Sequence, residues 1–135
     1  MLTYLLDTNI IIYVMKRRPL EVLSIFNANA GRMAISAITL AELYHGAEKS
    51  AKVHQNLLAI EEISSLLDVL PYTGKAAQHY GSIRASLEHA GQPIGLNDLH
   101  IAAHARSEGL TLVTNNWGEF SRVPGLLVEN WISTN

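Results

Sequence analysis

An apolar stretch near the start of the chain is interrupted by one acid, and this pattern restricts the fold more than any other feature. Residues 2–6 are typical of a short buried strand, and Asp7 follows directly at its carboxyl end. Thr8 or Asn9 can then cap the helix that begins there. In open parallel α/β sheets, ligands bind beyond the carboxyl ends of the strands. Asp7 is therefore either a site residue or a helix-capping residue, and this stretch alone leaves both interpretations open.

The rest of the chain alternates short apolar runs with longer amphipathic segments. Further strands are predicted at residues 33–36, 68–72, 110–114 and 126–129. Helices are predicted at residues 9–16, 20–29, 53–67, 74–90 and 99–107, with another opening at Ser36 and a short helical turn at 119–120. This alternation predicts right-handed βαβ units and an α/β fold, a twisted, mostly parallel sheet of about five strands with helices on both faces. A chain of 135 residues is expected to form a single domain over 1–135.

Composition excludes several classes of protein. Cysteine is absent, which rules out disulfides, cysteine zinc sites and a cysteine nucleophile. No apolar run approaches the roughly 18 residues of a membrane span, and no basic leader precedes the first apolar run. We therefore expect a cytoplasmic protein with no membrane partner. The formal net charge of -2 provides no overall basic field, so a nucleic-acid partner would need local basic residues and bound cations.

Several acids are expected at one edge of the predicted sheet. Asp7 ends a strand, Glu42 lies near the start of the helix after the second strand, and Asp98 opens a helix behind a glycine-rich loop. Glu119 lies just past the fourth strand. Clustered carboxylates repel one another unless a cation neutralises them, and oxygen ligands without cysteine favour Mg²⁺ or Mn²⁺. Such ions activate water for phosphodiester cleavage.

Each of these acids also has a purely structural interpretation. Thr39-x-x-Glu42 matches a capping box, Asp98 can cap its helix or favour its dipole, and Glu119 can be an exposed acid in a turn. Their common placement at one edge favours a site. His100 and His104 have the spacing of metal ligands, but the glutamate of a His-Glu-x-x-His motif is missing, so we expect them to pack or to form hydrogen bonds.

Four motifs then occur in order along nearly the whole chain. They are Leu5-Leu6-Asp7-Thr8-Asn9, Ile35-Ser36-x-x-Thr39-x-x-Glu42-Leu43, Gly95-x-x-Asp98-x-x-Ile101-Ala102-x-His104-Ala105 and Val113-Thr114-Asn115-Asn116-x-x-Glu119-Phe120. Together they resemble the PIN-domain ribonucleases, and more narrowly the VapC toxins of VapBC toxin–antitoxin pairs. The resemblance implies a PIN-like fold over the chain.

The resemblance also implies roles for the acids. Asp7, Glu42 and Asp98 match the metal-binding acids of the family, so they would hold Mg²⁺ or Mn²⁺. The family commonly has a further acid in a Thr-x-Asp pattern after the fourth strand. Here residues 114–116 read Thr-Asn-Asn, so the nearest carboxylate is Glu119. The expected catalytic set is Asp7, Glu42, Asp98 and Glu119.

The same resemblance implies supporting residues and partners. Thr8, Thr114 and Asn116 would orient the acids. The protein would be a toxin that hydrolyses structured RNA, such as tRNA, to 5′-phosphate and 3′-hydroxyl ends. It would form a homodimer, and a cognate antitoxin would complete a hetero-oligomer and insert a basic side chain among the acids. Candidate RNA contacts are the basic residues Lys16, Arg17, Lys49, Arg84 and Arg106.

Other interpretations predict different residues. A phosphatase of the haloacid dehalogenase type needs a second aspartate where Asn9 stands. A phospho-acceptor signalling domain needs an acidic pair beside its acceptor aspartate, and residues 4–6 supply none. A non-catalytic PIN fold that only binds proteins remains the alternative to the nuclease.

Overall fold

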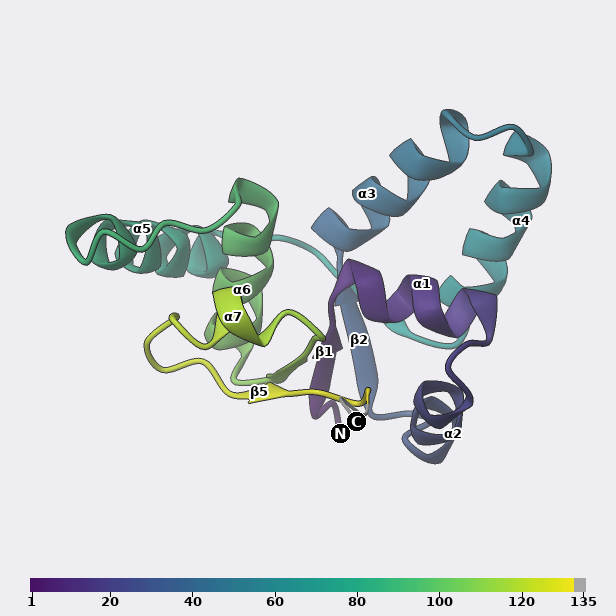
Figure 1. Ribbon diagram of the computed structural model, residues 1–135, viewed down its shortest axis with the longest axis horizontal. Helices are drawn as coiled ribbons and strands as arrows, with labels where there is room; N and C mark the ends of the chain where they lie inside the picture. Colours follow the sequence, from purple (N-terminus) through teal and green to yellow (C-terminus); the bar gives the residue numbers. More distant parts are fainter. Residues whose placement is uncertain (133–135) are drawn as a thin grey trace.

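Five short parallel strands form the centre of the molecule. The computed structural model describes residues 1–132. The strands are β1 (Tyr4–Leu6), β2 (Met33–Ser36), β3 (Asp68–Leu70), β4 (Thr111–Val113) and β5 (Val128–Glu129), and their order across the sheet is β3-β2-β1-β4-β5. Figure 1 labels β1 and β2, which lie side by side, and β5. In the central strand, Leu5 lies opposite Ala34 of β2 and Leu112 of β4. All three are fully buried, which explains why these strands are continuously apolar rather than alternating.

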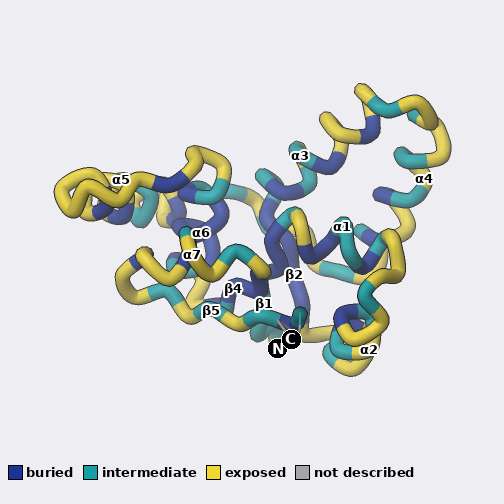
Figure 2. Tube along the Cα trace, in the orientation of Figure 1, coloured by how far each residue is buried: buried dark blue, intermediate teal, exposed yellow. Residues whose placement is uncertain are grey.

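Helices cover both faces of this sheet. They are α1 (Thr8–Lys16), α2 (Leu20–Ala28), α3 (Ala37–Glu48), α4 (Val53–Ser64), α5 (Gly74–His89), α6 (Leu96–Glu108) and the short α7 (Trp117–Phe120). Leu5 faces a core cluster shared with α5 and α6, whereas the next residue, Leu6, faces a second cluster shared with α1 to α4. Successive side chains of a strand point to opposite faces, so the two cores lie on the two sides of the sheet (Figure 2). The predicted α/β fold is confirmed.

Several predicted element ends agree with the structure. Strand β2 has the predicted bounds, and Thr73 caps α5 by accepting a hydrogen bond from the Ala76 N–H at 3.5 Å. Gly109 follows α6 with φ of +67°, the left-handed conformation in which glycine avoids a Cβ clash. The other strands are shorter than predicted at their ends, where backbone pairing in the sheet stops.

At two helix starts the structure decides between alternatives that the sequence left open. Asp7 itself caps α1, accepting a hydrogen bond from the Ile10 N–H at 2.9 Å, so neither Thr8 nor Asn9 is the cap. Ser36 caps α3, and the helix continues through Gly46. The predicted capping box from Thr39 to Glu42 is therefore absent, because Thr39 lies inside the helix and is buried.

The helix carrying the third acid also begins earlier than predicted. It starts at Leu96, directly after Gly95, so Asp98 is in the first turn and does not cap the helix. None of the helices in the described part of the chain combines the length and the apolar character that crossing a bilayer requires.

Candidate active site

Asp7 is the buried centre of the acid cluster. Its side chain is 4% exposed and caps α1 from the end of β1. Burial raises the pKa of its carboxyl, and the charge of Glu42 raises it further. Hydrogen bonds from the Thr114 side chain and from the backbone N–H groups of Ile10 and Asn9 act in the opposite direction. Both sequence interpretations therefore apply: Asp7 is the cap of α1, and it also stands among other acids.

Glu42 is held by residues from two other helices. The Thr8 hydroxyl donates to its Oε1 at 2.7 Å, and the Asn97 amide donates to its Oε2 at 3.2 Å. Thr8 begins α1 and Asn97 lies in the first turn of α6. Glu42 therefore connects α1, α3 and α6 through its two carboxylate oxygens.

The pKa of Asp98 is raised by burial and by the other acids of the cluster. It rises from an ordinary 3.8 to about 7, first because of burial, then because of a hydrogen bond and charge repulsion with Glu119. The charges of Asp7 and Glu42 raise it further. Two carboxyl groups that are hydrogen-bonded to each other must share a proton. One carboxyl group of the Asp98–Glu119 pair is therefore protonated and uncharged near neutral pH.

Glu119 is in turn held by Asn116. The Asn116 amide donates to Glu119 Oε2 at 3.2 Å, while Asn116 Oδ1 accepts the Glu119 N–H at 3.4 Å and so caps α7. The hydroxyl of Thr114 accepts the Asn116 N–H at 2.9 Å. These contacts explain how the segment after β4 brings a carboxylate back toward Asp98.

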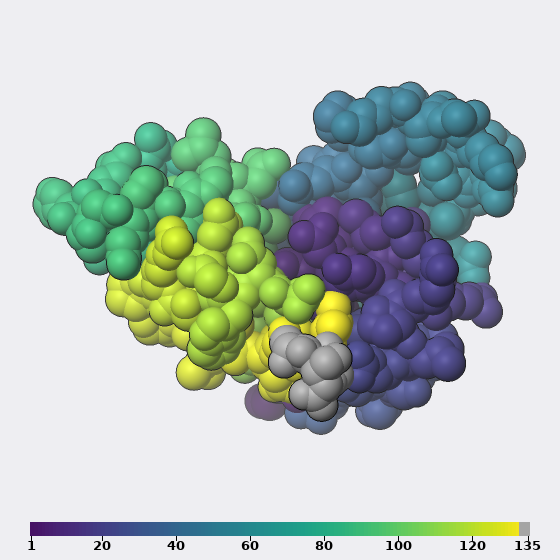
Figure 3. Space-filling model, viewed as in Figure 1, coloured from purple at the N-terminus to yellow at the C-terminus, as the bar shows by residue number. Residues whose placement is uncertain are grey.

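The four acids thus come from four segments at the carboxyl edge of the sheet. Figure 3 shows the surface hollowed between the green lobe of α5 and α6 and the blue lobe of α3 and α4, whose facing helices α6 and α3 carry Asp98 and Glu42. All four are oxygen donors, which suits a hard divalent cation in kind. Within residues 1–132, however, no three Asp, Glu, His or Cys side chains are arranged to hold a metal ion as they lie here. Both oxygens of Glu42 accept hydrogen bonds, from Thr8 and Asn97, and Asp98 is hydrogen-bonded to Glu119.

Comparison with known proteins identifies the family of this chain. The sequence model of the PIN domain matches residues 4–126. The chain belongs to the PIN domain family. It is 60% identical to Ribonuclease VapC2 of Haemophilus influenzae over 98% of this chain and 100% of the relative. It is 52% identical to the tRNA(fMet)-specific endonuclease VapC of Shigella flexneri, over 97% and 99% of the two chains.

A solved structure gives the same result for the fold. A chain of the DNA-bound VapBC from Salmonella typhimurium superposes with a TM-score of 0.94 at 48% identity, covering 98% of this chain and 100% of that one. Within the PIN domain family, the chain is therefore a VapC ribonuclease, as the sequence motifs predicted.

Each of the three polar residues that the resemblance assigns to orienting the acids contacts one of them, and the orienting role itself stays a prediction. Thr8 contacts Glu42, Thr114 contacts Asp7, and Asn116 contacts Glu119. Asn97 was missed by the sequence analysis. The signal that could have found it is its place beside Asp98 in the first turn of α6.

The basic candidates are not gathered around the acids. Lys16 and Arg17 stand at the end of α1, about 13 Å of helix away from Asp7 at 1.5 Å per residue. Lys49 follows the far end of α3. Arg84 is exposed and pairs with Glu88 at 3.3 Å. Their contact with RNA stays a prediction.

Arg106 has a structural role that the sequence did not show. Its guanidinium donates to His79 Nδ1 at 2.9 Å and to the Pro124 carbonyl at 2.8 Å. It thereby connects α6 to α5 and to the segment before β5. These bonds engage the guanidinium, so its predicted RNA contact would have to compete with them.

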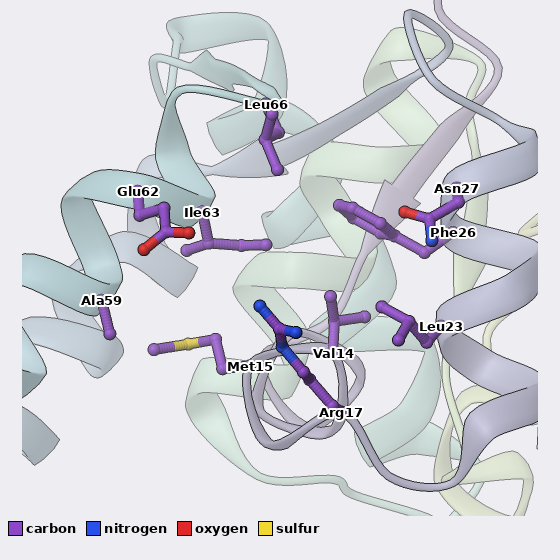
Figure 4. Close-up of a pocket in the computed structure, with 10 residues that line it drawn as sticks. All are labelled: Val14, Met15, Arg17, Leu23, Phe26, Asn27, Ala59, Glu62, Ile63 and Leu66. Atoms are coloured by element: carbon purple, nitrogen blue, oxygen red, sulfur yellow. The ribbon is translucent and has the colours of Figure 1, made fainter.

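Two hollows lie on the face of the PIN domain that α1 to α4 cover. The larger, of about 310 Å³, lies between α1, α2 and α4 and is lined by apolar residues together with Arg17 and Glu62 (Figure 4). The smaller, of about 160 Å³, lies between α1, α3 and α4 and has Glu42 at its wall. Met15 lines both. The hollows therefore form neighbouring recesses, of which only the smaller reaches an acid of the cluster, Glu42.

Proposed function

We propose that this VapC ribonuclease is a Mg²⁺- or Mn²⁺-dependent endoribonuclease toxin. Its proposed substrate is a structured RNA, primarily tRNA. The observation that carries the metal site is the gathering of four carboxylates at one edge of the sheet, where burial first, and then Glu119, Asp7 and Glu42, raise the pKa of Asp98 to about 7. Repulsion among such carboxylates is what a divalent cation relieves. The tRNA substrate is supported by the name of the relative from Shigella flexneri.

In this proposal, Asp7, Glu42 and Asp98 hold the cation and Glu119 assists. A bound divalent cation lowers the pKa of a water molecule and balances charge on phosphate oxygens. Loss of the shared proton between Asp98 and Glu119 frees a carboxylate oxygen for that role. Thr8 holds Glu42 by donating to it, so its hydroxyl sets the direction of the free lone pairs.

The same arrangement supports hydrolysis as the reaction. A carboxylate of this cluster can accept the proton of an attacking water molecule, and solvent can supply the proton that the departing 3′-oxygen takes up. We therefore propose that water attacks phosphorus in line and that the 3′-oxygen leaves. The products would carry 5′-phosphate and 3′-hydroxyl ends, and their end groups can be read directly with a phosphatase and a 5′-phosphate-dependent exonuclease.

The experiment that tests the proposal compares cleavage of total tRNA with and without EDTA. The purified chain, its Asp7→Asn variant and its Asp68→Asn variant are assayed with Mg²⁺ or Mn²⁺. Asp68 is the matched control, since it is an exposed acid at the opposite, amino end of a strand. We expect EDTA and Asp7→Asn to remove cleavage and Asp68→Asn to keep it.

Two results would contradict this proposal. Cleavage that survives both EDTA and Asp7→Asn would place the activity elsewhere. Folded parent protein that binds neither metal nor RNA would favour the alternative, a non-catalytic PIN fold that binds a protein partner.

We further propose a homodimer neutralised by a cognate antitoxin that covers the acids. The Salmonella typhimurium neighbour, a VapBC structure, supports such a partner. Because Met15 lines both hollows and Glu42 the smaller one, an antitoxin segment lying along this face would end at the acids.

Met15→Lys should abolish capture by the antitoxin and retain cleavage. Leu58→Lys is the control, because Leu58 is exposed on α4 and lines neither hollow. Capture that Met15→Lys leaves intact would exclude this path.

A further inference from the structure

A buried hydrogen bond joins the two helices that carry Glu42 and Asp98. His104 in α6 is 0% exposed, and its Nδ1 lies 2.7 Å from the Ser36 Oγ at the end of β2. Ser36 is also 0% exposed. The two residues are far apart in the sequence, so this contact belongs to the tertiary structure rather than to either helix.

Ser36 already serves as the cap of α3, and this determines how the pair is protonated. Its Oγ accepts the Ile38 N–H at 3.0 Å, and its hydroxyl proton is directed to His104 Nδ1. Burial lowers the pKa of His104, while the charge of Glu108 and the nearby carbonyl of Pro71 act in the opposite direction. The Pro71 contact is weak. It falls short of a full hydrogen bond, because Nε2 has no partner within residues 1–132. The neutral ring with its proton on Nε2 and Nδ1 accepting from Ser36 satisfies the most groups.

The acids stand symmetrically about this bond. Glu42 lies six positions after Ser36 along α3, and Asp98 lies six positions before His104 along α6. At the site, α3 and α6 are also linked by the Asn97–Glu42 hydrogen bond, which is longer, at 3.2 Å, and exposed. A short buried hydrogen bond resists a shift of one helix along the other more strongly than an exposed hydrogen bond does, because water cannot replace its partners.

We propose that the His104–Ser36 hydrogen bond is a positioning pair that sets the separation of Glu42 and Asp98 and thereby the affinity of the acid site for a divalent cation. The inference rests on the metal-dependent function proposed above. An apolar side chain would fill the same volume without leaving Nε2 unpaired, so packing alone does not account for a histidine here.

The chemistry of the pair makes the test selective. Asn at position 104 places its amide oxygen where Nδ1 stands and can accept from Ser36, whereas Gln reaches toward the position of Nε2 instead. Both have neutral side chains that a helix tolerates. Ser107→Ala is the matched control, because it removes another buried hydroxyl from α6 whose bond, to the His104 carbonyl at 2.8 Å, stays within the helix.

The experiment measures Mn²⁺ binding to the purified chain by the electron paramagnetic resonance signal of free Mn²⁺, with thermal unfolding measured on the same samples. We expect His104→Ala and His104→Gln to raise the Mn²⁺ dissociation constant on the order of tenfold. The Mn²⁺ dissociation constants of His104→Asn and Ser107→Ala should stay within about threefold of the parent value. On the free-energy scale, a threefold change is about half of a tenfold change, so the two groups of variants can be told apart. In the RNA assay, kcat should fall with the first two variants while KM stays unchanged.

Three results would overturn the inference. Folded His104→Gln that binds Mn²⁺ like the parent would show that the bond positions nothing. Ser107→Ala that weakens binding as much as His104→Ala would reduce the effect to general stability. Parent protein that does not bind Mn²⁺ would refute the proposed function together with this inference, whereas the first two results refute the inference alone.

Discussion

Replacing Asp98 by Asn should stabilise the metal-free protein at neutral pH. Burial, Glu119 and the charges of Asp7 and Glu42 raise the pKa of Asp98 from 3.8 to about 7. Between these two values the unfolded chain has released the proton and the folded chain still holds it. The free energy of unfolding therefore falls as the pH rises from about 4 to about 7 and is level above that range. Asn has nearly the same shape and no charge, so this loss should disappear.

The magnitude follows from the same values. The difference between 3.8 and about 7 is about three pH units, which corresponds to about 4 kcal/mol at 1.36 kcal/mol per unit. Asp98 is only partly buried and shares its proton with Glu119, so solvent screening and coupling reduce the gain. We expect Asp98→Asn to add about 1–2 kcal/mol at pH 8 and nothing at pH 4.

Urea unfolding in EDTA at pH 4, 5.5 and 8 measures this difference. The control is Asp68→Asn, which removes an exposed acid far from the cluster and should follow the parent at each pH. Adding Mn²⁺ at pH 8 should stabilise the parent and leave Asp98→Asn almost unchanged. If the parent and Asp98→Asn show the same pH dependence between pH 4 and 8, then Asp98 is not strained by its neighbours and the charge argument for the site is refuted.

Three further predictions concern the site and the core. Thr8→Val should lower the cleavage rate about tenfold by removing the donor to Glu42, while Thr8→Ser keeps the rate; equal rates for both would show that this hydrogen bond is dispensable. Ile35→Ala should lower the free energy of unfolding by about 2–5 kcal/mol because Ile35 is fully buried, and a loss below about 1 kcal/mol in urea unfolding would contradict the packing described. RNA added to an Asp7→Asn chain that does not cleave should change the fluorescence of Trp117, which is 58% exposed beside the site. The fluorescence of Trp131, which is 4% exposed, should stay the same. A Trp117→Phe chain that keeps the full change in fluorescence would exclude this contact.

The order and type of the main elements could be predicted because their signals are local. The strand β2 and the caps at Thr73 and Gly109 depend on short stretches of sequence, and they agree with the structure. The sequence left the caps of α1 and α3 open between alternatives, because several polar residues in succession can each cap a helix. Which one does so depends on where the preceding strand ends, and strand ends are set by pairing with neighbouring strands.

The motifs named the acids of the candidate site and three polar residues beside them, but not the particular hydrogen bonds that join them. The sequence placed Asp7, Glu42 and Asp98 at one edge because parallel strands share their carboxyl edge. It offered no sign that Asn97 donates to Glu42, since the two residues are 55 positions apart. The basic candidates were chosen by charge alone, and charge does not reveal which end of a helix lies near the acids.

The sequence by itself determined the α/β class, the parallel sheet and the identity of the acids, because hydrophobic periodicity and residue type act over a few neighbouring positions. Only the tertiary structure decided which oxygens are engaged, how strongly the pKa of Asp98 is raised, and that His104 meets Ser36. Those properties depend on distances between separate segments and on exclusion of water, and both arise only when the helices pack against the sheet.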